Sequence, residues 1–259
     1  MPNHAPMGAA RAPKGPRCTP ARKVKPQLVQ IASINIDRMT ELKWTHITEW
    51  LGKQTPTVIA CAIQHHQLVS ASHLDTAQSQ YVPVFTEFAI GLAGGLAGGV
   101  GWVVHREWVN RITETSGIGE GPNCKWVEVD GKHKLVSVYI QPNADHEQNT
   151  LKLLQSIQQE VNVSRSVVWM GDANCPVNES CALAMVWKSA CDTAGATLVD
   201  SEGGWGATPT RHPRGEQAGK PSHIDVIVAS QKAQHDLSPT LVAIGTGTSL
   251  DCPTRRGRD

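Results

Sequence analysis

The sequence predicts a mixed α/β domain built from layers of strands and helices. Short apolar runs rich in β-branched residues alternate along the chain with longer segments whose apolar residues recur at helical spacing. Several of the short runs end in an aspartate or asparagine, and strand ends are where α/β proteins commonly carry their chemistry. A chain of 259 residues, 40% of them hydrophobic, is long enough for one such core.

The first third of the chain predicts two strands and a helix. Residues 28–36 form an apolar strand that stops at Asp37, and residues 57–63 form a second, buried strand before a polar stretch. Between them, residues 40–53 predict a helix with Thr40 as its N-cap. The apolar residues expected to form the buried stripe of this helix are Leu42, Ile47, Trp50 and Leu51.

The middle and end of the chain continue the alternation. A strand is expected at residues 98–105, and a hairpin at 126–129 and 134–141 around the turn dipeptide Asp130–Gly131. Residues 145–161 and 181–194 predict helices, and in the first of these the expected apolar face is Leu151, Leu154, Ile157 and Val161. The remaining strands are expected at residues 166–170, 224–229 and 241–244.

The N-terminal segment, residues 1–26, differs from the rest in composition. It contains six basic residues, six prolines and no acidic residue. Such a segment buries too little apolar surface to fold, so we expect a disordered basic arm. Nonspecific contact with nucleic-acid phosphates is one interpretation of its charge. A solvated tail or a linker within a longer polyprotein is the alternative. The folded domain is expected at residues 27–259.

Charge and cysteine usage narrow the class of protein. The net charge of +1 gives no general basic field, so any contact with nucleic acid must come from local patches. Seven scattered cysteines without a C-x-x-C pair favour reduced thiols. The sequence has no apolar run long enough for a membrane span and no secretory signal pattern. We therefore expect an intracellular protein, nuclear or cytoplasmic.

Polar residues at the strand ends predict a metal-dependent site. Hydrolysis of a phosphodiester needs a cation on the phosphate, an oriented water and donors for the charge that develops. Hard cations such as Mg²⁺ prefer carboxylate and amide oxygens. The residues that offer such oxygens are Asn35, Asp37, Asp172, Asn174, Asp225 and Asp251. Each alone is as compatible with a turn or a strand cap.

The order of these motifs resembles a known family. The segment Trp169–Met170–Gly171–Asp172–Ala173–Asn174 is preceded by Ser33–Ile34–Asn35–Ile36–Asp37 and Val138–Tyr139, and followed by Ser222–His223–Ile224–Asp225 and Leu250–Asp251–Cys252. This series resembles the endonuclease/exonuclease/phosphatase (DNase I-like) family, and within it the endonuclease domains of non-LTR retrotransposons. The resemblance runs from about residue 27 to 251. It implies a four-layer α/β sandwich of two packed mixed β-sheets flanked by helices.

The resemblance also implies roles for individual residues. Asp172 would orient or deprotonate the attacking water, Asn174 and Tyr139 would reach the phosphate, and Asp225 would orient the residue at position 252. Mg²⁺, with Mn²⁺ as the alternative, would lie near Asn35, Asp37 and Asp251. DNA is the implied substrate, and a polyprotein with reverse transcriptase is the implied context. Three loop residues are candidates for substrate contact: Trp205, Thr210 and Arg211. A loop-packing tryptophan and a solvated arginine are the plainer alternatives for Trp205 and Arg211.

The chain departs from the family pattern at two positions. His65 stands where the family has a metal-binding glutamate, and Cys252 stands where it has the catalytic histidine. An imidazole favours softer ions than Mg²⁺, and loss of a proton-transfer group typically costs about 10²- to 10⁴-fold in rate. The sequence after Cys252 also lacks the expected closing strand. The open alternatives are a weakened nuclease, an inactive fold that binds nucleic acid or protein, and a Zn²⁺ site that includes His65 and Cys252.

Overall fold

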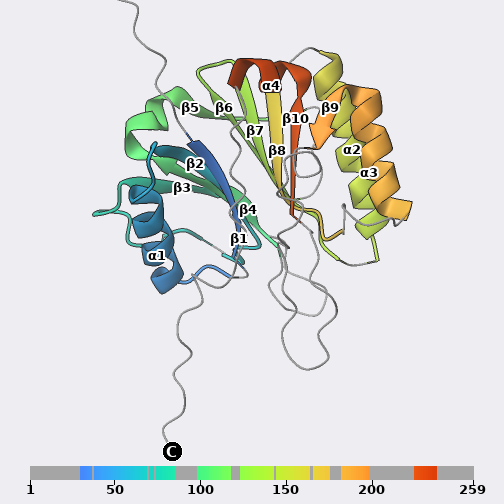
Figure 1. Cartoon of the computed structure of the whole chain (residues 1–259). Coiled ribbons are helices and arrows are strands. Elements are labelled where there is room, and N and C mark those ends of the chain that lie inside the picture. The colour runs from blue at the N-terminus through green and yellow to red at the C-terminus, as the bar shows by residue number, and fades with distance from the viewer. Residues whose placement is uncertain are drawn as a thin grey trace, which may run out of the picture.

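The computed structural model describes residues 30–36, 38–68, 70–72, 74–85, 98–117, 123–142, 144–163, 166–175, 182–198 and 225–237. These residues form two β-sheets packed face to face, with helices on both outer faces (Figure 1). The predicted four-layer α/β sandwich is confirmed.

The first sheet has four strands in the order β1-β2-β4-β3. Strands β1 and β2 pair in parallel, and both other pairings are antiparallel. Helix α1 (Glu41–Gly52) covers the outer face of this sheet (Figure 1), and Thr40 caps the helix by accepting a hydrogen bond from the Lys43 N–H. The strands are β1 (Gln30–Asn35), β2 (Val58–Gln64), β3 (Tyr81–Phe85) and β4 (Val100–His105).

The second sheet has six strands in the order β5-β6-β7-β8-β10-β9. Strands β7 and β8 are parallel, whereas the other neighbours are antiparallel. Helices α2 (His146–Asn162) and α3 (Ala182–Ala194) cover its outer face (Figure 1). The strands are β5 (Ile112–Thr115), β6 (Cys124–Val129), β7 (His133–Tyr139), β8 (Ser166–Asp172), β9 (Ala196–Leu198) and β10 (Asp225–Ser230). A 3₁₀ helix η1 (Arg106–Arg111) follows β4, and α4 (Gln231–Leu237) follows β10.

Three apolar cores fill the spaces between the four layers. The core around Trp44 and Ile47 joins α1 to the first sheet, and the core around Trp169 and Trp187 joins the second sheet to α2 and α3. The central core joins the two sheets and includes Trp102, which lies on β4 and is fully buried. Burial of large side chains in each space, at roughly 1.5 to 3 kcal/mol apiece, favours this stacking over isolated layers.

The helix stripes differ in part from the prediction. In α1 the buried residues are Trp44, Ile47 and Leu51, whereas Leu42 is 51% exposed. Leu42 is five residues before Ile47, a spacing that places it on a different side of the helix. In α2 the same error affects Leu151, which is 44% exposed while its neighbours Leu153 and Leu154 are buried.

The hairpin prediction is confirmed. Strands β6 and β7 pair as far as Val129 and His133, and the Lys132 N–H donates to the Val129 carbonyl across Asp130 and Gly131, whose φ angles are 55° and 64°. Two such left-handed residues are what a type I′ turn requires. Strands β3, β5 and β9 were not predicted. The expected strand at 241–244, the missing closing strand and the N-terminal arm lie outside the described residues. Among the helices that are described, none has both the length and the apolar character of a membrane span.

Candidate functional site

Strand alternation places the polar strand ends in one common space. In β7 and β8, Leu135 and Met170 point into the central core between the two sheets. Because side chains on a strand alternate between its two faces, Tyr139 and Asp172 point to this same inner side. On β10 the same alternation from Ile227 brings Asp225 to the inner side. The site is therefore the end of the inter-sheet core, where the strands change from apolar to polar.

The six-stranded sheet contributes three neighbouring side chains. Tyr139 is paired with Asp172 across the parallel β7–β8 ladder, and Asp225 is paired with Asp172 across the antiparallel β8–β10 ladder. Asp172 is only 3% exposed and Tyr139 5%. The sequence resemblance assigned all three residues to one site, and the strand register places them side by side.

The four-stranded sheet reaches the same carboxylate from the other side. The Asn35 Nδ2 donates to the Asp172 Oδ2 at 2.6 Å, joining residues 137 positions apart in the sequence. Hydrogen bonds to an ionised carboxylate are among the stronger ones in proteins. The bond orients the Asp172 carboxylate and fixes Asn35 at the mouth of the inter-sheet space.

The turn after β8 holds the other Asp172 oxygen. The backbone N–H of Asn174 donates to the Asp172 Oδ1 at 2.7 Å, and the Asn174 side-chain amide donates to the Ile140 carbonyl at 2.8 Å. Asn174 has a φ of 47°, which asparagine tolerates better than most residues. The His146 Nε2 donates to the Ala173 carbonyl at 2.9 Å, so the first residue of α2 also fixes this turn.

The surroundings of residue 171 explain why a glycine precedes Asp172 in the chain. Its φ is 152°, and a Cβ at this position would lie 1.9 Å from the Val138 carbonyl oxygen. The close approach of β7 to β8 therefore excludes any side chain here. Asp172 and Tyr139 gain their side-by-side placement from that approach.

His65 lies against Tyr139 in the site. Its φ of 56° turns the chain at the end of β2, and its ring stacks on the Tyr139 ring with 4.9 Å between centroids and a 10° angle between planes. The Gln67 Nε2 lies 2.7 Å from the His65 Nε2. Since an amide nitrogen only donates, the imidazole nitrogen is the acceptor in this pair. The residue at the position where the sequence resemblance implies a glutamate thus packs on an aromatic ring.

Six of the predicted site residues are described and converge: Asn35, His65, Tyr139, Asp172, Asn174 and Asp225. The other six lie outside the described residues: Asp37, Trp205, Thr210, Arg211, Asp251 and Cys252. Within the described part of the chain, no group of three or more His, Cys, Asp or Glu side chains is placed to hold a metal ion. A complete cation site would need Asp37 and Asp251 in addition to Asn35.

Sequence reasoning missed a polar chain directly behind the site. Gln64 and Ser137 are both fully buried in the space between the sheets, next to otherwise apolar core residues. The spacing of polar residues in the sequence could have indicated this chain. Ser33 and Asn35 are polar residues two positions apart on one apolar strand, and Ser137 and Tyr139 have the same spacing on another.

Comparison with solved structures shows which fold this arrangement belongs to. An AP endonuclease from Archaeoglobus fulgidus is similar with 13% identity, a TM-score of 0.56, and 78% of this chain and 86% of that chain covered. A 3′-5′ exonuclease, NExo, from Neisseria meningitidis is similar over the same shares, with 14% identity and a TM-score of 0.56. The chain has the DNase I-like fold.

A structure of a Neisseria NExo variant, there called a 3′ phosphatase and bound to a product DNA hairpin, has the same coverage, with 13% identity and a TM-score of 0.55. At these identities the likeness concerns the DNase I-like fold alone. By sequence, the chain matches no protein-family model and no curated protein.

Proposed function

We propose that this chain is a divalent-metal-dependent phosphodiesterase that cuts DNA, of the retrotransposon endonuclease type. The observation that carries the proposal is the doubly held Asp172. One carboxylate oxygen accepts from Asn35 of the first sheet and the other from the Asn174 backbone. A carboxylate fixed in this way, at the polar end of an inter-sheet core, suits the orientation and deprotonation of a water molecule.

The neighbouring groups would supply donors for the charge that develops during hydrolysis. Tyr139 can donate its hydroxyl proton to a phosphate oxygen, and Asn174 lies directly beside the Asp172 carboxylate that would orient the water. Asp225 is paired with Asp172 on the next strand, and under this proposal it would orient the side chain at position 252. The role proposed for Cys252 has the least support, because a thiol is a poorer proton-transfer group than imidazole at neutral pH.

The metal proposal rests on the donor chemistry of the chain. Asn35, Asp37 and Asp251 offer amide and carboxylate oxygens, which suit Mg²⁺ or Mn²⁺, and His65 is the fourth proposed neighbour. When bound, such an ion would neutralise charge on the scissile phosphate. The described residues alone do not make a cation site, so the proposal depends on the two aspartates beyond them.

The proposed substrate is DNA. Support comes from the Neisseria structure with product DNA, which has the same fold, and from the basic segment at residues 1–26. Trp205, Thr210 and Arg211 are the proposed contacts, through stacking on a base and pairing with phosphate. A polyprotein that also carries reverse transcriptase is the proposed context.

A second function is favoured by the His65–Tyr139 stack. An imidazole packed on Tyr139 replaces a carboxylate that would face a cation, and Cys252 replaces the family's catalytic histidine. These two changes fit a fold that has lost catalysis and binds nucleic acid or a protein partner. The two functions share the same surface and differ in whether a bond is broken.

Nicking of supercoiled plasmid, in Mg²⁺ and then in Mn²⁺, separates the two functions. The variants are Asp172→Ala and the double variant His65→Glu/Cys252→His, each checked for folding by circular dichroism. Nicking by the native chain that Asp172→Ala abolishes establishes the proposed nuclease. Nicking by the double variant alone establishes that catalysis was lost at those two positions. If neither the native chain nor the double variant nicks the plasmid while both still bind it, the binding function replaces the nuclease proposal.

A further inference from the structure

A chain of polar side chains, two of them fully buried, joins the two sheets directly behind the site. The Ser33 hydroxyl on β1 donates to the Gln64 Oε1 at 3.3 Å. The Gln64 Nε2 donates to the Ser137 Oγ on β7 at 3.2 Å, and Ser137 in turn donates to the Ile63 carbonyl at 3.1 Å. Gln64 and Ser137 are both 0% exposed. We call Ser33, Gln64 and Ser137 the inter-sheet bridge.

The bridge lies one step inside the site on every strand that it uses. Ser33 and Asn35 share one face of β1, and Ser137 and Tyr139 share one face of β7, because they are two residues apart. Gln64 is followed directly by His65. From the core outward, the contacts of the inter-sheet bridge come first. The Asn35–Asp172 hydrogen bond and the His65–Tyr139 stack come next.

Stability alone does not account for this arrangement. Buried polar groups cost free energy unless they are bonded, and apolar residues of similar size would fill the core with less risk. A bonded network does give something that apolar packing lacks, which is a single relative placement of the groups that it joins. Here it joins the sheet that carries Asn35 to the sheet that carries Asp172.

We propose that Gln64, through the inter-sheet bridge, is a positioning residue that sets the spacing of the two halves of the site. It touches no substrate and acts through the Asn35–Asp172 hydrogen bond and the His65–Tyr139 stack. The catalytic consequence rests on the proposed nuclease function. The structural consequence, loss of the stack when the bridge is broken, does not.

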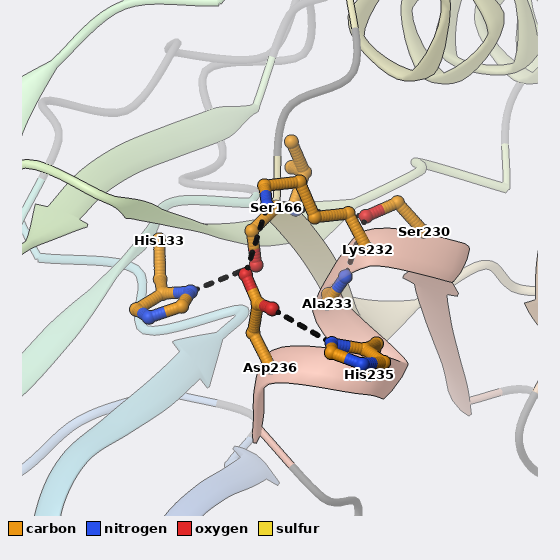
Figure 2. A network of polar contacts seen from close by, with 8 residues as sticks. His133, Ser166, Ser230, Lys232, Ala233, His235 and Asp236 are labelled. Carbon is orange, nitrogen blue, oxygen red and sulfur yellow. Dashed lines mark hydrogen bonds and ion pairs between the residues drawn. The ribbon is translucent and has the colours of Figure 1, made fainter.

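The bridge is tested with two single variants, their double and a matched control. Ser137→Ala leaves the buried Gln64 amide without its acceptor, and Gln64→Leu leaves the partly buried Ser33 hydroxyl without its acceptor. The double variant Gln64→Leu/Ser137→Ala removes both members of the buried pair. The control is Ser230→Ala. Ser230 is a buried serine whose hydroxyl accepts from the backbone N–H groups of Val167 and Ala233 at the opposite end of the same sheet (Figure 2).

The first readout is the NMR shift of the His65 ring protons, assigned by their absence in His65→Gln. Stacking on Tyr139 moves these signals upfield, and replacement of Tyr139 by leucine gives their unstacked position. We expect Ser137→Ala and the double variant to move them toward the unstacked position, and Ser230→Ala to leave them in place. Unchanged His65 signals in Gln64→Leu, Ser137→Ala and the double variant would overturn the proposal, whether or not the protein nicks DNA.

The second readout compares thermal stability with nicking. The double variant should regain part of the melting temperature that Ser137→Ala loses, because it removes the buried Gln64 amide that Ser137→Ala leaves without its acceptor. Its kcat should stay reduced, on the order of 10- to 100-fold, with little change in KM. If kcat recovers together with stability, the bridge contributes to packing only and does not position the site. If the native chain does not nick, this readout rejects the proposed nuclease function, and the His65 signals alone decide the bridge.

Discussion

The two ends of the β7–β8 strand pair carry similar residue types and differ in what they can do. At one end, Tyr139 and Asp172 meet Asn35 from the opposite sheet. At the other end, the same strands begin with His133 and Ser166, and Asp236 of α4 lies beside them (Figure 2). A serine, a histidine and an aspartate together suggest a hydrolase triad. The geometry at this second end is that of a structural cluster.

The hydrogen bonds and ion pairs at the second end show why this cluster is structural. The His133 Nδ1 lies 2.8 Å from the Ser166 Oγ, but Ser166 is only 1% exposed, so its hydroxyl is closed to a substrate. The Asp236 carboxylate is engaged by Lys232 at 3.2 Å and His235 at 3.1 Å, both on its own helix. All these groups belong to one sheet and the helix that follows it. The site end instead joins two sheets, which suggests that convergence of separate elements is the better mark of function.

The largest expected effect contrasts Asp172→Asn with Ser166→Ala. Asparagine at position 172 keeps the size of the side chain but removes its charge, so nicking should fall by about 10²- to 10⁴-fold. Ser166→Ala should nick at the native rate, since the contact described for its hydroxyl is the hydrogen bond with His133. Initial nicking rates at matched folded concentration measure both. A comparable loss of activity in Ser166→Ala would mean that the second end is catalytic after all.

A second contrast concerns the buried ion pair at the second end. The Lys134 Nζ lies 3.2 Å from the Glu160 Oε1, and the two side chains are 6% and 0% exposed. Glu160→Gln leaves a buried cation without its counter-charge and should lower the free energy of unfolding by about 3 to 5 kcal/mol. The double variant Lys134→Met/Glu160→Leu should regain most of this. Urea denaturation measures the free energies, and nicking below the melting temperature should be unaffected in both.

A third contrast compares two glycines with positive φ. A Cβ at Gly171, at the site end, would collide with the Val138 carbonyl, whereas a Cβ at Gly131 in the hairpin would meet nothing within 4 Å. Gly131→Ala should cost about 1 kcal/mol from its left-handed backbone alone. Gly171→Ala should cost about 3 kcal/mol or more, because strain and a backbone clash combine. Equal melting temperatures for the two variants would contradict the close approach of β7 and β8.

The smallest expected effect is a pH dependence at the second end. Burial lowers the pKa of His133, and the Asp236 carboxylate opposes this by raising it. Below the ordinary histidine pKa of about 6.5, the unfolded chain therefore binds more protons at this residue than the folded chain. Stability should fall as the pH drops through that value. His133→Gln should show a shallower fall in melting temperature between pH 7.5 and 5.5, and an equal slope would exclude His133 as a cause.

Sequence reasoning found the strands that lie inside the sheets and missed most of those at the edges. Strands β3, β5 and β9 are all edge strands, and each is partly exposed. Apolar patterning weakens when one side of a strand faces water, and Pro83 within β3 argues against a strand in any but an edge position. Strand β1, the remaining edge, was predicted because its run from Gln30 to Asn35 is largely apolar.

For the six predicted site residues that the structure describes, the sequence predicted that they lie near one another but not which contacts they make. The order of Asn35, Tyr139, Asp172 and Asp225 along the chain matched a known pattern. The Asn35–Asp172 hydrogen bond depends on how two sheets pack, which no local pattern encodes. The His65–Tyr139 stack depends on a positive φ at His65, a conformation that is uncommon for residues other than glycine.

The division of the site between two sheets has a consequence for how the protein is made. Among the described residues, the strands of the first sheet end at residue 105 and those of the second begin at residue 112, so these two groups of strands leave the ribosome one after the other. Until the second half arrives, the inner face of the first sheet is uncovered, including Trp102, whose indole N–H finally donates to the Lys125 carbonyl. A newly synthesised first half therefore exposes an aggregation-prone apolar surface. Pausing of translation between these halves would favour aggregation over folding.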